Sequence, residues 1–279
     1  MRASAARVFP GVVDSDMTTA IRSWIRRRQS PGVWLTREQP KPDGGTRTIH
    51  APCDALKHLL RGLNHRYFAP IDTDPHCHCR KGTGVLKAVR LHRAHPALLH
   101  RDLMSFFPSV TRDRIRKTLT RRGYAPRIAA DFAAICTVNG VLPQGSPTSV
   151  SLANLVLAGL DARIGTLCRD NGLTYTRYVD DIAVSGGEVR LAKIELLIDR
   201  IIEDDGWLCG SKGGFFPAGS YREYLGVNIG DELRVGAKAK SKAILAHEAL
   251  ERGEITHDEF AARLGWVRAV EGPSLPSLS

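Results

Sequence analysis

Two adjacent aspartates, Asp180 and Asp181, constrain the fold of this chain more than any other feature. Residues 174–177 before them and 182–184 after them favour strands, which predicts an antiparallel hairpin with both carboxylates at its tip. Most Asp-Asp pairs in proteins are simply solvated turn residues. Here, however, two neighbouring charges between apolar strands require hydration, pairing or a cation, so we expect a metal site.

A third carboxylate, Asp102, ends a separate apolar segment that begins at Ala97. Three carboxylates without a His or Cys ligand match a hard cation such as Mg²⁺ better than zinc. Two such ions can activate a 3′-hydroxyl and neutralise the charge on phosphorus and on leaving pyrophosphate. The sequence therefore predicts phosphoryl transfer at two Mg²⁺ ions, for which Mn²⁺ is the expected substitute.

The charge balance indicates the class of partner. The chain has 279 residues and carries 40 Lys and Arg against 29 Asp and Glu, a formal net charge of +11. A basic surface of this size favours polyanionic partners, nucleic acid first among them, although composition alone is equally compatible with a merely basic soluble protein. The length accommodates one large core or two modest ones and so excludes little.

The cellular setting follows from cysteine usage and from the N-terminus. Six scattered cysteines, and an N-terminal segment without the apolar core of a signal peptide, predict a reduced, cytoplasmic protein. We expect no membrane partner, because charges interrupt every stretch before it reaches the roughly 18 apolar residues that span a bilayer.

The segment His76-Cys77-His78-Cys79 suggests a zinc site. Alternate residues of an extended chain point to opposite faces, however, so four consecutive ligands do not easily surround one ion. We expect buried thiols and exposed imidazoles instead.

Hydrophobic periodicity predicts an α+β order of elements. Helices are expected over residues 21–28, 56–67, 112–122 and 191–201, and a helical tail after the capping box of Thr256 and Glu259. The turn-rich residues 41–45 predict a hairpin, and residues 97–103, 207–209 and 224–227 are expected to be strands. A strand, a helix, a strand pair, a helix and a strand in this order are typical of an α+β fold.

Three motifs occur in a fixed order: RDLMSFFPS at residues 101–109, LPQGSPTS at residues 142–149 and YVDD at residues 178–181. Together they resemble bacterial reverse transcriptases, closest to the retron type, over about residues 47–230. The resemblance implies a right-hand polymerase with fingers, an antiparallel-sheet palm and a small helical thumb, over residues 1–96, 97–230 and 231–279. It also implies RNA-directed DNA synthesis from dNTPs on an RNA template-primer.

The resemblance assigns the catalytic chemistry to five residues. Asp102 and Asp180 are the principal metal ligands, the Leu103 carbonyl assists them, and Asp181 contributes on the primer-end side. Lys212 resembles the lysine that protonates leaving pyrophosphate, and its neighbouring glycines predict a mobile loop.

Further residues are implied to bind the nucleotide. Phe107 is expected beneath the incoming sugar, where its bulk excludes a 2′-hydroxyl and makes DNA the product. Gln144 and Gly145 open a loop that contacts the nucleotide and template, and the alternative for Gln144 is a turn residue that satisfies local backbone. Arg47 resembles the fingers arginine that folds onto the triphosphate, and Lys41 is a second candidate that can equally be a solvated surface lysine. Contacts to nucleic acid are expected from Arg112, Arg116, Arg121 and Arg122.

Two departures concern the subtype. Where retron enzymes show Asn-Ala-x-x-His and Val-Thr-Gly, this chain has KAVRLH at residues 87–92 and Tyr224-Leu225-Gly226. A retron enzyme makes a short DNA linked to a structured noncoding RNA in antiviral defence, together with an effector protein. The alternatives are a diversity-generating, other defence-associated or group II intron-like reverse transcriptase, and a non-catalytic RNA-binding palm scaffold. The acidic triad argues against the scaffold, because clustered carboxylates repel one another and oppose polyanion binding.

Overall fold

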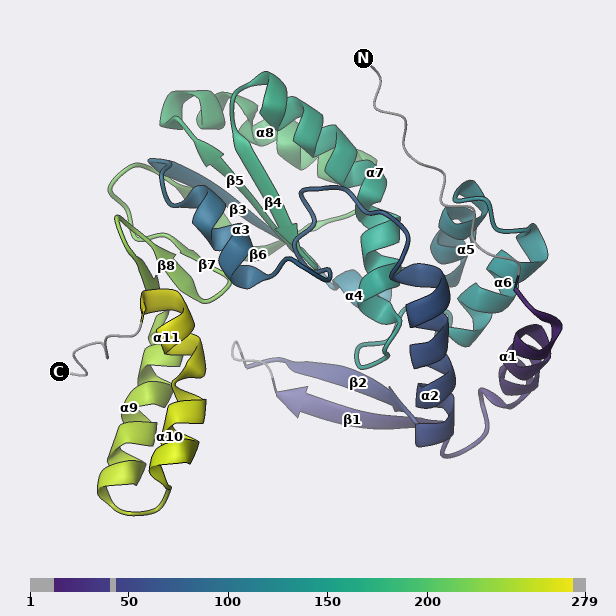
Figure 1. Cartoon of the computed structure of the whole chain (residues 1–279). Helices are drawn as coiled ribbons and strands as arrows, with labels where there is room; N and C mark the ends of the chain where they lie inside the picture. Colours follow the sequence, from purple (N-terminus) through teal and green to yellow (C-terminus); the bar gives the residue numbers. More distant parts are fainter. Residues whose placement is uncertain (1–12, 41–43, 273–279) are drawn as a thin grey trace. The chain divides into compact units, whose positions relative to one another are not determined.

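Consecutive buried residues from Ala97 to Leu99 are typical of a strand that is covered on both faces. In the computed structural model, which describes residues 13–40 and 44–272, this segment is part of β3 (Ala97–Leu103). With β4 (Thr174–Tyr178), β5 (Asp181–Gly186) and β6 (Cys209–Phe216), it forms an antiparallel sheet ordered β4-β5-β3-β6 (Figure 1). The predicted α+β class with antiparallel sheets is confirmed.

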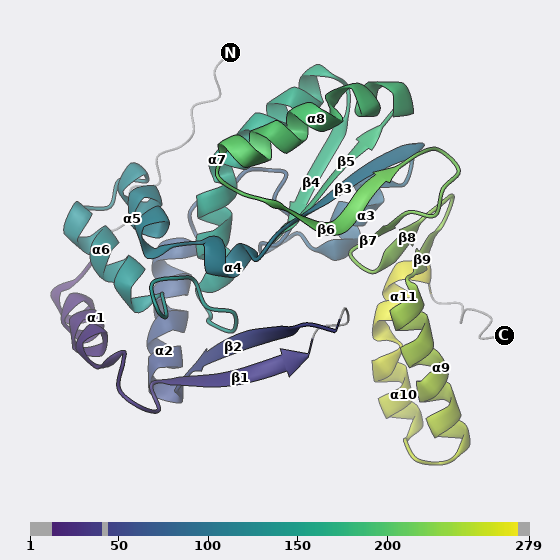
Figure 2. The same ribbon diagram turned by 180° about the vertical axis from the view of Figure 1, so that it is seen from behind.

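The chain divides into two units, one of residues 1–75 and 105–161, the other of residues 76–104 and 162–279. The second unit contains the four-stranded sheet. The helix α8 (Glu188–Asp204) packs on one face of it, against β3, β5 and β6, and α3 (Val85–His92) packs on the other, against β4 and β5 (Figure 2). Successive side chains of β3 therefore alternate between two covered faces, with Arg101 toward α8 and Leu98 in the cluster that includes Val89 of α3.

A small sheet and three helices complete the second unit. The strands β7 (Glu223–Tyr224), β8 (Val227–Ile229) and β9 (Leu233–Val235) are antiparallel. The helices α9 (Ala237–Glu251), α10 (His257–Arg263) and α11 (Gly265–Glu271) share a hydrophobic cluster with these strands. The capping box of Thr256 and Glu259 is confirmed at the start of α10.

Three details of the sequence prediction for this unit are wrong. Residues 224–227 are not one strand, because Leu225 and Gly226 have positive φ angles of 53° and 75° and form the turn between β7 and β8. Trp207 lies before β6 rather than in a strand. Leu197, expected on the buried face of α8, is 46% exposed, while Ile198 and Ile202 are buried.

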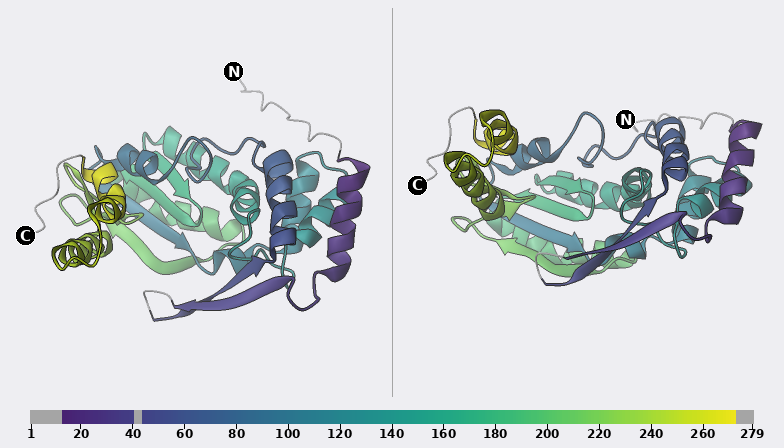
Figure 3. Two further views of the ribbon diagram at one scale, coloured as in Figure 1. Left: turned by 60° about the horizontal axis from the view of Figure 1, so that its bottom comes forward. Right: turned by 90° about the horizontal axis from the view of Figure 1, so that it is seen from below.

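The first unit consists of helices and a hairpin. The strands β1 (Trp34–Pro40) and β2 (Thr46–Pro52) pair as the predicted antiparallel ribbon (Figure 3). Around its aromatic core, where Tyr67, Phe68 and Tyr124 all contact the ring of Phe132, the unit has further helical segments. These are α1 (Ser15–Arg27), α2 (Asp54–Leu63), the π-helical turn η1 (Asn64–Phe68), α4 (Phe106–Ser109), α5 (Arg112–Arg121) and α6 (Pro126–Ile135).

The helix α7 (Ser149–Asp170) belongs partly to each unit. By length and composition alone, α7 could cross a membrane, contrary to the expectation from sequence. No other helix in the described residues meets this criterion. Over its most apolar 18 residues, 56% is buried inside the protein, as in a core helix.

Candidate active site

The three acidic residues singled out in the sequence come together in the second unit. Asp102 near the end of β3 is the register partner of Asp181 at the start of β5, and Asp180 is the turn residue before Asp181. One carboxylate oxygen from each residue lies within 4.8 Å of the other two. Because all three donors are carboxylate oxygens, the set fits a hard divalent cation.

The turn that carries Asp180 is held in an uncommon conformation. Val179 has a φ angle of 57°, which a β-branched residue rarely adopts. Both polar groups of its backbone are bonded: Val179 N donates to Cys79 Sγ at 3.2 Å, and Val179 O accepts from Arg177 Nη1 at 2.7 Å. On the far side of the turn, Leu103 N donates to Asp180 O at 3.1 Å. The carboxylate is thus placed by β3 and by the segment around Cys79.

The electrostatics of the three aspartates favour a cation. Burial, then the negative charge of Asp181, and to a smaller degree that of Asp102, raise the pKa of Asp180 to about 6. Bringing like charges this close is unfavourable, and a divalent cation between the carboxylates offsets the repulsion.

His100 and Gly210 support the site, although sequence reasoning missed both. His100 Nε2 lies 2.9 Å from Asp181 Oδ1 and orients that carboxylate. A Cβ atom at Gly210 would lie 2.8 Å from Asp102 Oδ2, so only glycine fits beside this oxygen without a shift. His100 could have been found from the sequence, because it lies two positions before Asp102 and alternate residues of a strand point to the same face. No signal in the sequence places Gly210 there.

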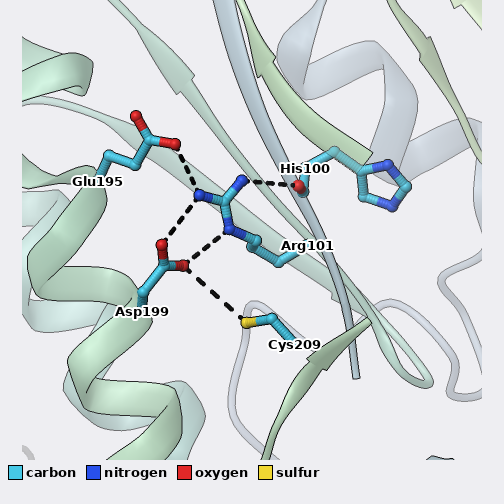
Figure 4. Close-up of polar contacts among 5 residues, drawn as sticks. All are labelled: His100, Arg101, Glu195, Asp199 and Cys209. Atoms are coloured by element: carbon cyan, nitrogen blue, oxygen red, sulfur yellow. Dashed lines mark hydrogen bonds and ion pairs between the residues drawn. The ribbon is translucent and has the colours of Figure 1, made fainter. Parts of the chain in front are cut away.

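Behind the site, Arg101 ties β3 to α8 (Figure 4). Its guanidinium donates to both carboxylate oxygens of Asp199, at 2.7 and 3.0 Å, and to Glu195 Oε1 at 2.6 Å. Such a bidentate pair fixes direction as well as distance. The residue immediately before Asp102 is therefore anchored on the opposite face of the sheet, while Asp102 itself remains on the site's face.

Lys212 lies in β6 rather than in the mobile loop predicted for residues 210–214. The strand is irregular there, because Gly213 has a φ angle of 88° and the β3–β6 register shifts between Arg101 and Leu103. The charge of Lys212 lowers the pKa of Asp180, against the larger raising effects of burial and of Asp181. The structure thus brings Lys212 near Asp180.

The residues expected to bind the nucleotide belong to the first unit. Gln144 O accepts from His50 N of β2 at 2.8 Å, so the main chain of Gln144 is bonded to a strand that is distant in sequence. Gly145 has a φ angle of 106°, and a Cβ there would lie 2.9 Å from Ile49 Cγ2. Phe107 lies in α4, half-buried beside Phe106, and Arg47 is exposed on β2. Lys41 lies outside the described residues.

The four arginines expected to contact nucleic acid are on or beside α5. Arg116 pairs with Asp113 at 2.6 Å, and Arg112 Nε donates to Thr137 Oγ1 at 3.2 Å. Arg121 donates to Thr118 Oγ1, and Arg122 to the carbonyl of Asp72. These bonds are local to the first unit.

The histidines and cysteines at residues 76–79 do not gather as metal ligands; in the part of the chain that the structure describes, the aspartate triad is the one metal-ligand cluster. The thiol of Cys77 is buried, with Cys77 Sγ 3.6 Å from Cys79 Sγ. The expectation of exposed imidazoles is wrong for His78, which is 7% exposed.

An antiparallel sheet with three acidic oxygens at one end is the kind of site that enzymes of phosphoryl transfer build for divalent cations. Comparison with known proteins narrows this class. Residues 39–199, more than half of the chain, match the family described as reverse transcriptase (RNA-dependent DNA polymerase), and the chain belongs to this family.

Curated relatives are retron reverse transcriptases. The chain is 34% identical over 247 residues to the retron Mx65 reverse transcriptase of Myxococcus xanthus, covering 80% of this chain and 58% of that protein. It is 31% identical over 214 residues to the retron Ec86 reverse transcriptase of Escherichia coli, covering 76% and 67%. With the retron Ec73 reverse transcriptase of Escherichia coli, the identity is 29% over 279 residues and 85% of each chain is covered.

Proposed function

We propose that the chain is a retron-type RNA-directed DNA polymerase that extends a primer on an RNA template by two-metal-ion nucleotidyl transfer. The observation that carries this proposal is the convergence of three carboxylate oxygens within 4.8 Å in a chain of the reverse transcriptase family. Two Mg²⁺ ions, or Mn²⁺ in their place, would supply activation of the primer 3′-hydroxyl and neutralisation of the leaving pyrophosphate.

The residues of the second unit would hold and orient the reacting groups. Asp102 and Asp180 would be the principal ligands, assisted by the Leu103 carbonyl, and Asp181 would serve the primer-end side. Lys212 would protonate the leaving pyrophosphate, a role supported by its electrostatic effect on Asp180.

The residues of the first unit would bind the substrate. Phe107 would exclude ribonucleotides, Gln144 and Gly145 would contact the nucleotide, and Arg47, with Lys41, would fold onto the triphosphate. The template-primer would contact Arg112, Arg116, Arg121 and Arg122. We assign fingers to residues 1–96, palm to 97–230 and thumb to 231–279.

The biological product would be a short DNA linked to a structured noncoding RNA, made in the cytoplasm for antiviral defence together with an effector protein. Support comes from the similarity to several proteins that carry the name retron reverse transcriptase.

The test is primer extension with Mg²⁺, comparing Asp180→Asn with Asp170→Asn. Loss of the Asp180 charge removes a metal ligand, so we expect extension to fall by about a thousandfold or more while RNA binding is retained. Asp170 is exposed at the end of α7, 3.6 Å from Arg169, and its substitution should leave extension unchanged. Near-normal extension by Asp180→Asn would contradict the metal assignment, and RNA binding without extension by the unmodified protein would favour the scaffold alternative.

A further inference from the structure

A basic pocket lies in the second unit, at the end of β3 opposite to Asp102. It has a volume of about 580 Å³ and is lined by Arg90, Arg93, Ala94, His95, Pro96, Arg222 and Asp231. Arg90 and Arg93 are exposed near the end of α3, and Arg222 comes from the segment before β7. Two segments that are far apart in sequence, the end of α3 and the residue before β7, thus place three arginines around one hollow.

Two of the three arginines are positioned by carbonyl groups rather than by carboxylates. Arg93 Nε donates to the backbone carbonyl of Asp231 at 2.7 Å, and Arg222 Nη1 donates to the carbonyl of His95. Arg222 Nε is buried without a hydrogen-bond partner in the described residues. A carbonyl partner leaves the positive charge of a guanidinium unbalanced, whereas a carboxylate partner would balance it.

The balance of charge in the pocket is positive. His95 Nδ1 lies 2.7 Å from Ser185 Oγ, and burial together with the charge of Arg222 lowers its pKa, so its ring is neutral at pH 7. Three arginines therefore face one carboxylate, that of Asp231. Guanidinium groups converging in this way match the tetrahedral oxygens of a phosphate, which accept hydrogen bonds from two donors of one guanidinium.

The pocket is separate from the metal site. Pro96 lines the pocket directly before β3 begins, and Asp102 lies six residues further along the chain, so roughly 20 Å separate them at about 3.3 Å per residue. A nucleotide that reacts at the aspartates cannot also fill this pocket. In a duplex the phosphates of one strand advance about 3.4 Å each along the helix axis, so a bound template-primer can present one roughly six base pairs from the reacting end.

From this geometry we propose that Arg90, Arg93 and Arg222 bind a backbone phosphate of the RNA that the enzyme uses, at a distance from the reacting end. The proposal rests on the polymerase function proposed above. The exposure of Arg90 and Arg93 gives a polymer access, and the anchored Arg222 forms the fixed wall of the pocket.

The test measures RNA binding as a function of salt for Arg90→Gln/Arg93→Gln and for Arg169→Gln. Arg169 is an exposed arginine of the same unit outside the pocket, and its substitution controls for loss of general charge. For the double variant we expect the slope of log K against log salt to shrink by about 0.7 to 0.9, the value for one lost phosphate contact. The dissociation constant for RNA should rise about tenfold at 0.15 M salt, as expected for the loss of one phosphate contact. Arg169→Gln should stay close to the unmodified protein.

A second measurement separates RNA phosphate from free phosphate. Inorganic phosphate is added at constant ionic strength, and the thermal stability of the unmodified protein and the double variant is compared. If phosphate stabilises only the unmodified protein while the salt slopes for RNA are equal, the pocket takes free phosphate and the RNA assignment is wrong. Equal salt slopes for RNA, together with no stabilisation of either protein by phosphate, would show that the pocket binds neither RNA nor phosphate. Primer extension by the unmodified protein tests the proposed polymerase function independently, so the failure of that function can be distinguished from the failure of the phosphate site.

Discussion

Val179 combines a β-branched side chain with a left-handed backbone conformation, which costs roughly 1–3 kcal/mol. The hydrogen bonds to Cys79 and from Arg177 offset this cost at the backbone itself. The conformation directs Asp180 toward Asp102 rather than along the strand. The strain is therefore located beside the residues proposed to bind metal.

At the proposed nucleotide site, Phe107→Ala should reduce discrimination against ribonucleotides by about ten- to a hundredfold, since removal of the ring frees space for a 2′-hydroxyl. The measurement is the ratio of kcat/KM for dNTP and rNTP incorporation, which is insensitive to partial loss of folded enzyme. Tyr221→Ala, which removes an exposed aromatic side chain, is the control and should keep the ratio. An unchanged ratio for Phe107→Ala would remove Phe107 from the gate.

Single residues of the site were predictable where local rules apply. Asp102, Asp180 and Asp181 were found because strand ends and hairpin turns have local sequence signals, and their proximity is confirmed. Cys79 and Gly210 were not found, because each reaches the site from a distant segment through one backbone contact or one missing Cβ. Such contacts depend on the pairing of strands, which a single sequence does not state.

At the scale of elements, the junction of β3 and β6 depends on glycine. A Cβ atom at Gly213 would lie 2.4 Å from the backbone carbonyl oxygen of His100, and its φ angle is 88°. Backbone atoms cannot give way as a flexible side chain does. The close approach of the two strands next to the aspartate triad therefore requires this residue.

Gly213→Ala should destabilise the protein by about 2 kcal/mol or more, because both the φ angle and the steric contact oppose it. Urea unfolding provides the measurement. Gly187→Ala is the matched control, since Gly187 has a φ angle of −64° with nothing within 4 Å of an added Cβ. Similar unfolding midpoints for the two variants would show that β6 can move away from β3.

Elements were predictable where periodicity was clear and less so where glycine interrupted it. The helices α5 and α8 and the hairpin β4–β5 follow from spacing alone. Glycines around Lys212 suggested a loop, but pairing with β3 makes this segment a strand. The apolar Leu225 concealed a turn, because a left-handed conformation is uncommon for leucine.

At the scale of the molecule, a buried polar network joins α3 to the main sheet. His92 is fully buried, with Nδ1 2.6 Å from Ser185 Oγ and Nε2 2.7 Å from Thr176 Oγ1. Burial, and then the neighbouring charges of His95 and His78, lower the pKa of His92 to about 3. The folded protein therefore keeps His92 neutral at pH values where the unfolded chain protonates it.

Stability should consequently fall as the pH drops below about 6.5. Between pH 6.5 and 3 the unfolded chain binds the proton and the folded chain does not, so acid favours unfolding; above pH 6.5 the loss is absent. From pH 7.5 to 5.0 the contribution of His92 is about 2 kcal/mol. The measurement is the difference in unfolding free energy between the unmodified protein and His92→Gln at both pH values. A difference that does not change with pH would contradict this role of His92.

The order of strands in the main sheet could not be predicted. Strands β3 and β5 pair across about 80 residues, and β6 joins on the other side of β3. No local pattern specifies such pairing, whereas the neighbouring β4 and β5 follow from one hairpin signal. The order of the predicted elements indicated the α+β class and the family resemblance implied an antiparallel palm sheet, but neither gave the order of its strands.

This long-range pairing has a consequence for biosynthesis. Because β3 leaves the ribosome long before β5, the emerging chain contains Asp102 without its partners. Closing a loop of about 80 residues must precede any gathering of the carboxylates, which makes the sheet slow to form. Cation affinity should therefore be acquired late and all at once, and a polypeptide truncated before Asp181 should have none.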